Sequence, residues 1–217
     1  MPDTQPLWIW EDALKRYRHT DTGRFIGAAE MMDLRDEFMA RQKLIMSEAV
    51  DKYRAGSLSL TELRDRMKYI VKQTTIDMYA MGAGGRNNLS QRDWGRIGAM
   101  VKDQYNFLRG FVNQIAEGRL SQKQIESRMA MYINSANEAL WKALTRDYGF
   151  SLPAYPGDGS TSCLTNCRCT WNITKVPDGY DCYWILGDAE HCDECRERAV
   201  TWSPWKYPES RNERNLL

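Results

Sequence analysis

The sequence has no apolar run near the roughly 18 residues that a membrane-spanning helix needs,. Its start, Met1-Pro2-Asp3-Thr4, lacks the basic and then apolar layout of a signal peptide,. We therefore expect a cytosolic protein without a membrane segment. Charge of one sign does not dominate either, because 30 Lys and Arg stand against 29 Asp and Glu, a net charge of +1. A dedicated nucleic-acid binder usually shows a basic excess, so any DNA contact is expected to be local and weak.

Histidine is scarce, which limits the catalytic chemistry that the chain can support. Only 2 are present, His19 and His191. His19 lies in a polar N-terminal stretch with no identifiable nucleophile for a catalytic triad. The segment Gly157-Asp158-Gly159-Ser160 is rich in glycine but lacks the Lys and the following helix of a phosphate-binding loop, and we interpret it as a turn. The sequence thus predicts a protein that is not an enzyme.

Cysteine is missing from most of the chain. All 6 cysteines lie between Cys163 and Cys195. A secreted disulfide scaffold would distribute them through a short chain. Crowding of cysteines in one segment of a cytosolic chain instead favours a metal site.

What the sequence does contain is ordinary globular composition, with 42% hydrophobic and 27% charged residues in a chain of 217,. We predict a mainly α fold: an antiparallel bundle of long helices followed by a small zinc-stabilised β-hairpin module. Three segments are expected. These are an N-terminal arm with a short helix (1–27), a four-helix region (28–148), and a cysteine-rich module with an extended tail (149–217).

The N-terminal arm carries two tryptophans close together. Leu7-Trp8-Ile9-Trp10 is strongly apolar and is followed by the charged stretch from Glu11 to Arg18, which favours a short helix. Two indoles so near the start of the chain need burial. Trp8 and Trp10 either dock on the chain's own helices or act as anchors into a partner protein.

Helix start and stop signals recur through the four-helix region. Ser59 with Glu62, and Ser121 with Gln124, fit the capping box, and Leu89-Ser90 opens the third helix in the same way,. The stretch from Gly56 to Met67 resembles that from Gly118 to Met129 at an offset of about 62 residues,. We therefore interpret the region as two related helix hairpins.

The C-terminal segment changes from helical to alternating patterns. Trp171 and Ile173 share one face, as do Trp184 and Leu186, and Pro177-Asp178-Gly179 supplies a turn between them,. This pattern predicts a β-hairpin with cysteines on both sides. Residues 201–217 are expected to be extended.

The cysteine spacing predicts a structural zinc site. Cys163-x3-Cys167-x-Cys169 precedes the hairpin, and His191-Cys192-x-x-Cys195 follows it. Zinc takes four soft ligands in a tetrahedron, and two close ligands from each of two turns supply them. We expect Cys163, Cys167, Cys192 and Cys195 to be the ligands, with Cys169 and His191 as alternates and Cys182 in the core. Disulfides and plain buried thiols are the competing interpretations.

Two stretches resemble the C-terminal region of tailed-phage minor head proteins, the head-morphogenesis family. They are Pro156 to Cys169 (PGDGSTSCLTNCRC) and Trp184 to Cys195 (WILGDAEHCDEC). The arm from Tyr17 to Ile26 and the segment from Asp93 to Leu108 are similar to such proteins as well. Many members carry His-Pro-Asn-Cys-Arg-Cys, whereas this chain has Leu164 at the His position. The first ligand is therefore open between Cys163 and Cys169.

The resemblance implies a minor capsid component of the virion, at the portal vertex or in the head interior, taken into the head during assembly in the host cytoplasm. Its partners would be the portal protein or the major capsid protein, and a homo-oligomer is left open. The alternative function is a zinc-ribbon adaptor or nucleic-acid-binding regulator. Arg168, Arg196 and Arg198 are the basic residues near the cysteines that would serve it.

Overall fold

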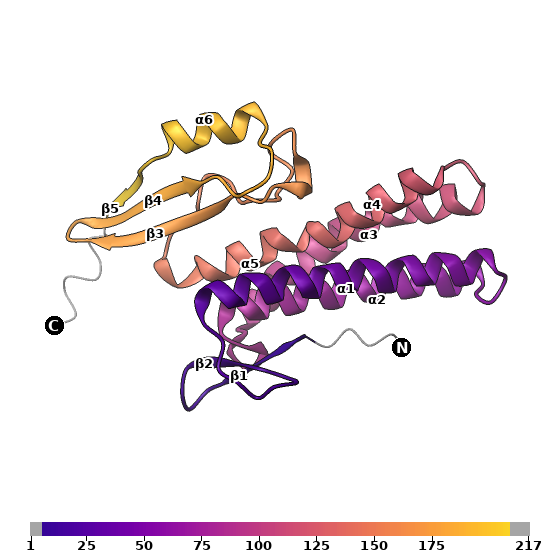
Figure 1. The fold of residues 1–217 in the computed structure, drawn as a ribbon, viewed down its shortest axis with the longest axis horizontal. Coiled ribbons are helices and arrows are strands. Elements are labelled where there is room, and N and C mark those ends of the chain that lie inside the picture. Colours follow the sequence, from indigo (N-terminus) through magenta and orange to yellow (C-terminus); the bar gives the residue numbers. More distant parts are fainter. Residues whose placement is uncertain (1–5, 209–217) are drawn as a thin grey trace.

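The structure is a computed structural model that describes residues 6–208. The fold is mainly helical with two small antiparallel sheets (Figure 1). Its longer elements are β1 (Trp8–Glu11), β2 (Arg16–His19), α1 (Ala28–Arg54), α2 (Leu60–Ala83), α3 (Gln91–Ala116), α4 (Gln122–Asn134), α5 (Ala136–Leu144), β3 (Thr170–Val176), β4 (Gly179–Ile185), α6 (Asp193–Thr201) and β5 (Trp205–Pro208). Within these described residues, no helix is both long and apolar enough to cross a bilayer.

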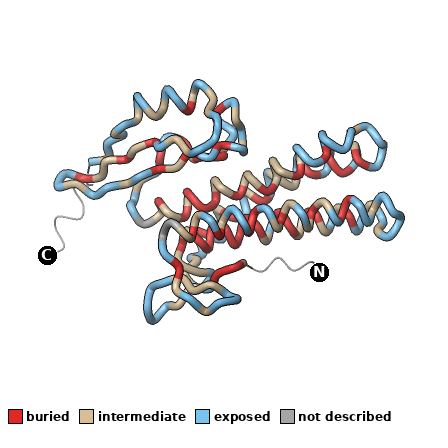
Figure 2. The backbone as a smooth tube through the Cα atoms, in the orientation of Figure 1, coloured by how far each residue is buried: buried red, intermediate tan, exposed pale blue. Residues whose placement is uncertain are grey.

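Helix α2 is the centre of the helical part. It packs against α1, α3 and α5, while α4 packs on α1. Figure 2 shows the buried positions on the inward sides of these helices and the exposed positions outside. The core is mostly aliphatic and methionine-rich, with Phe38, Met46, Leu63 and Leu108 among its fully buried members. Burial of this face supplies most of the stability that such helices have.

The helix ends follow the predicted signals. Ser59, Ser90 and Ser121 each cap a helix in a reciprocal box with the residue three positions later,. Gly56 and Gly118 both take left-handed backbone angles just beyond α1 and α3. In each case the backbone N–H groups of the glycine and of the next residue bond back to carbonyls of the last turn, as in a Schellman cap,. The turns after α1 and α3 therefore share their backbone geometry as well as their sequence.

The predicted fourth helix is interrupted at Ser135, giving α4 and α5. The Ser135 hydroxyl donates to the backbone carbonyl of Tyr132 (2.8 Å), and such local bonds bend helices. The break lets α5 lie close along α2. Gly82 allows this approach, because a Cβ at that position would lie 2.5 Å from the Leu140 carbonyl oxygen.

The N-terminal arm is a β-hairpin, so the predicted short helix is wrong. β1 pairs with β2 in antiparallel register, with Trp8 opposite His19 and Trp10 opposite Tyr17. The physical reason is that burial alternates along the residues from Trp8 to Trp10. Trp8 is buried, Ile9 is half exposed, and Trp10 is partly buried, which matches the two-residue period of a strand.

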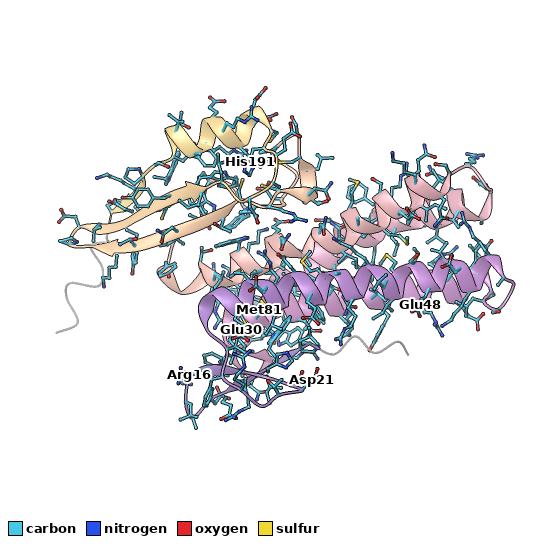
Figure 3. The ribbon with its side chains drawn as sticks, viewed as in Figure 1. Arg16, Asp21, Glu30, Glu48, Met81 and His191 are labelled. Atoms are coloured by element: carbon cyan, nitrogen blue, oxygen red, sulfur yellow. The ribbon has the colours of Figure 1, made fainter. Side chains whose placement is uncertain are left out.

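The hairpin docks on the chain's own helices. Trp8 packs edge-on against Phe38 with ring centroids 5.1 Å apart, and the Trp10 ring lies against Gly85. The Tyr17 hydroxyl donates to backbone carbonyls near the end of α2, including that of Met81, which Figure 3 labels just above the hairpin. Trp8 is thus buried against the chain's own helices, while Trp10 is partly buried and its indole N–H donates to Asp12 (2.9 Å). Docking on the chain's own helices is what the structure shows, and the partner-binding role of Trp8 and Trp10 stays a prediction.

The C-terminal sheet contains the predicted hairpin. β3 and β4 pair from Thr170 opposite Ile185 to Val176 opposite Gly179, which leaves Pro177-Asp178 as the turn. β5 pairs with β4 on its other side. Of the tail predicted to be extended, Trp205–Pro208 form this strand, whereas Thr201 ends α6 and a turn follows it; residues 209–217 lie outside the described part. Helix α6 lies along this sheet (Figure 1).

Candidate metal centre

Two short elements bring the cysteines together. A single helical turn, Leu164–Asn166, and the approach to β3 carry Cys163, Cys167 and Cys169. On the other side, Cys192 is the N-cap of α6 and Cys195 lies in its first turn. Leu164 takes a left-handed backbone angle (φ 50°), which is costly for a branched side chain. The surrounding contacts therefore hold this turn in one shape, with its sulfur atoms directed at α6.

The sulfur atoms of Cys163, Cys192 and Cys195 form one group. The Cys163 Sγ lies 3.2 Å from that of Cys192 and 3.7 Å from that of Cys195. The Cys167 Sγ is also 3.7 Å from the Cys195 Sγ. A tetrahedral zinc with bonds of about 2.3 Å places its sulfurs about 3.8 Å apart. Cys163, Cys192 and Cys195 thus have sulfur separations near those of a tetrahedral site, whereas Cys167, the fourth predicted ligand, contacts this group through Cys195.

A second group overlaps the first. Cys167, Cys169 and Cys195 also bring their sulfurs within reach of one ion, and the Cys169 Sγ lies 3.8 Å from His191 Nδ1. His191 Nε2 lies 2.8 Å from the Gly187 carbonyl oxygen. Donation by Nε2–H to that carbonyl would leave Nδ1 free to bind a metal or accept from a thiol. Figure 3 shows His191 between α6 and the ends of the strands. The structure therefore places both alternates beside the predicted four.

The thiols share protons unequally. A hydrogen bond from Cys169 lowers the pKa of Cys167 to about 5, and the same bond, with burial, raises the pKa of Cys169. Burial raises the pKa of both Cys163 and Cys195. The pKa of Cys192 is lowered: burial opposes the change, and hydrogen bonds from Cys163 and the backbone outweigh it. The cluster thus combines a thiolate that is ready to bind a cation, Cys167, with thiols such as Cys163 and Cys195 that must first lose a proton,.

Outer contacts that sequence reasoning missed support the cluster. The Thr161 hydroxyl lies 3.2 Å from the Cys163 Sγ, and Ser162 donates to Glu194 at the start of α6 (2.5 Å). Hydrogen bonding by Ser162 lowers the pKa of Glu194 to about 2. A run of small hydroxyl residues directly before Cys163 is the signal that could have indicated these partners.

Cys182 is fully buried and belongs to neither sulfur group, in agreement with its predicted core position. It shares a compact core with Trp171 and Trp184, which pack edge-on at 5.2 Å. Trp141 of α5 belongs to the same core. The cysteine cluster therefore lies at one end of a small core that also contacts the helical part.

Comparisons with protein-family models, with curated proteins and with solved structures found no match to this chain. Fold and site together define a mainly helical protein with small antiparallel sheets and a cysteine cluster that could hold a metal ion.

Proposed function

We propose that this chain is a non-catalytic minor capsid protein that acts in the assembly of a tailed-phage head by binding portal or capsid subunits. The cysteine segments that resemble the head-morphogenesis family, Pro156 to Cys169 and Trp184 to Cys195, support this assignment. So does the overall organisation, since long helices offer extended faces for docking and the cysteine module adds a small compact unit.

The bound ion in this proposal is a structural zinc held by Cys163, Cys167, Cys192 and Cys195. The observation that carries the proposal is the spacing of these sulfur atoms across two chain segments nearly 30 residues apart. Four thiolates close the coordination sphere, whereas a catalytic zinc keeps one position for water. Zinc would fix the turn before β3 to the start of α6 and so stabilise a module with a small core.

The arrangement of basic side chains favours this proposal over a nucleic-acid adaptor. The Arg198 guanidinium lies 4.7 Å from the centre of the Trp202 ring and donates to the Ser160 carbonyl oxygen (3.2 Å). Arg196 faces Asp193 at 3.5 Å. Two of the three arginines near the cysteines are thus engaged in contacts within the chain. Only Arg168 of the three is left for a nucleic-acid adaptor to use.

Zinc binding is tested by native mass spectrometry of the purified chain, before and after acid denaturation. We expect a mass excess of one zinc per chain that is lost on denaturation. Cys163→Ser and Cys192→Ser should each lower the zinc content, and Cys182→Ala is the matched control because this buried cysteine lies outside the cluster. A metal-free chain whose denatured mass is short by pairs of hydrogens would show disulfides and overturn the zinc assignment.

The head-assembly role predicts genes for a portal protein and a major capsid protein beside the gene of this chain, and it is tested by co-expression with those two proteins. We expect the chain to sediment with assembled heads in few copies, and to bind the purified portal protein. A gene surrounded by metabolic operons, or a chain that remains in the soluble fraction when heads form, would contradict the proposal.

A further inference from the structure

A cavity of about 410 Å³ lies where the helical part meets the cysteine-bearing segment. α1 contributes Arg35 and Lys43 to its lining, α5 contributes Asn137 and Trp141, and the cysteine segment contributes Thr165 and Arg168. Asn134 of α4 also lines it, and its amide donates to the Asn166 side chain across the junction (2.7 Å). The cavity therefore has walls from both parts of the molecule.

The cavity is cationic. Asp36 also lines the cavity and is ion-paired with Arg35 (2.8 Å), whereas neither Lys43 nor Arg168 forms an ion pair with an acidic residue in the part of the chain that the structure describes. Burial lowers the pKa of Lys43, and the neighbouring charge of Arg168 lowers it further, against an opposite effect of Asp36. Two like charges that face one cavity favour an anion between them.

The same walls carry buried polar atoms without a hydrogen-bond partner among the described residues. These are Trp141 Nε1, Thr165 Oγ1 and Asn137 Oδ1. Trp141 is only 5% exposed, and its N–H group can act only as a donor. A buried donor left unpaired is costly, so an acceptor beside Trp141 would stabilise the junction.

We propose that this cavity binds a phosphate group, with Lys43 and Arg168 balancing its charge and Trp141 and Thr165 as further donors. A phosphate carries a charge of about −2 and three acceptor oxygens, which matches two unpaired cations and two unpaired donors. Water could satisfy the neutral groups but would leave both cations unbalanced, and a carboxylate brings only one charge. The remaining space accommodates the group esterified to the phosphate, where Asn137 Oδ1 can accept a hydrogen bond. This site does not depend on the head-assembly proposal.

The test is calorimetric titration of the purified full chain with inorganic phosphate at constant ionic strength. We expect saturable binding of one phosphate, with a Kd on the order of millimolar. Lys43→Gln and Arg168→Gln should each weaken binding by about tenfold, because each removes a charge-assisted contact. Lys72→Gln removes the same charge from an exposed position of α2 outside the cavity, and we expect it to bind phosphate as the native chain does. Lys43→Gln keeps the test decisive if Arg168→Gln disturbs the adjacent cysteines.

Two competitors define the ligand. Acetate should displace phosphate only weakly, and a short thymidine oligonucleotide that ends in a 5′-phosphate should compete if the phosphate comes from a nucleic-acid end, because this terminal monoester carries about two charges whereas each internal phosphodiester carries one. An oligonucleotide that fails to compete would indicate a small phosphate ester, which agrees equally with the proposed site. Absence of saturable binding, equal affinity for acetate, or the same loss in Lys72→Gln would overturn the proposal.

Discussion

At the scale of single residues, the unequal proton affinities of the thiols determine how a metal would bind. Cys163 and Cys195 have raised pKa values and are protonated at neutral pH, whereas the Cys167 pKa of about 5 makes it a thiolate. Zinc binding by the four cysteines at pH 7 should therefore release at least two protons per ion, those of Cys163 and Cys195, and zinc affinity should fall as the pH is lowered. Calorimetry in two buffers of different ionisation enthalpy measures this release. A buffer-independent heat would contradict it.

Asp77 gives a second prediction at this scale. Its side chain is 1% exposed and paired with Arg86, whose Nε lies 2.9 Å from the Asp77 Oδ1. Burial raises the pKa of Asp77 from 3.8 to about 6, against the opposing effect of Arg86. Between about pH 4 and pH 6 the folded chain thus binds more protons than the unfolded chain. The contribution of Asp77 to stability accordingly falls as the pH rises through this window, by up to about 3 kcal/mol.

The Asp77→Asn variant should lack this pH dependence. Its free energy of unfolding, relative to the native chain, is expected to increase between pH 4 and pH 7. Urea unfolding at several pH values measures the difference. Asp65→Asn, at an exposed position of the same helix, serves as the control and should follow the native chain throughout. A constant difference between Asp77→Asn and the native chain would show that the buried carboxyl does not titrate in this range.

At the scale of elements, the contact between α2 and α5 depends on Gly82. Alanine normally stabilises a helix interior by up to about 1 kcal/mol relative to glycine. At Gly82, however, a Cβ would lie 2.5 Å from the Leu140 carbonyl oxygen and 2.8 Å from the Ala143 Cβ, so the helices would have to separate. We expect Gly82→Ala to destabilise the chain by about 1–3 kcal/mol, measured by chemical unfolding.

The matched control is Gly98→Ala in α3. A Cβ there meets no atom within 4 Å, so the normal helix preference should apply and stability should stay equal or increase. If both variants change stability in the same direction, close packing at Gly82 is not the cause.

The elements also show which features local sequence could predict. The serine caps and the glycine ends of α1 and α3 were predictable, because each depends on residues within one turn. The arm was not, since its strand pairing is coupled to the packing of Trp8 on Phe38, about 30 positions away. The clustering of the cysteines followed from spacing and a turn, but the choice among Cys163, Cys167 and Cys169 depends on sulfur positions that no local pattern gives.

Asp93 shows how a local prediction can miss a long-range role. It caps α3 with Ser90, as the capping box requires. Its carboxylate also accepts from the Tyr79 hydroxyl (2.7 Å) and from Arg146 (2.9 Å). Arg146 donates in turn to the carbonyl of Asn88 (3.0 Å). One buried carboxylate thus joins α2, α3 and the end of α5, and the resulting network is charge-assisted.

At the scale of the whole molecule, two cores differ in what holds them together. The helical core contains many aliphatic and methionine side chains. The second core consists of cysteines and tryptophans with Leu152, and aliphatic burial contributes little to it. Trp141 belongs to the second core although it lies on α5, so the two cores meet at that helix. The proposed zinc would therefore contribute far more to the stability of the second core than to that of the first.

Removal of the metal should accordingly unfold the C-terminal module and leave the helices folded. We expect amide hydrogen exchange after chelation to become fast in β3, β4 and α6 and to stay slow in α1, α2 and α3, because the helical core has its own buried apolar surface. The Cys192→Ser variant should show the same pattern without a chelator, and Cys182→Ala should not. Uniform loss of protection over the whole chain would mean that the cores unfold as one unit, and Trp141 would then couple them more strongly than their composition suggests.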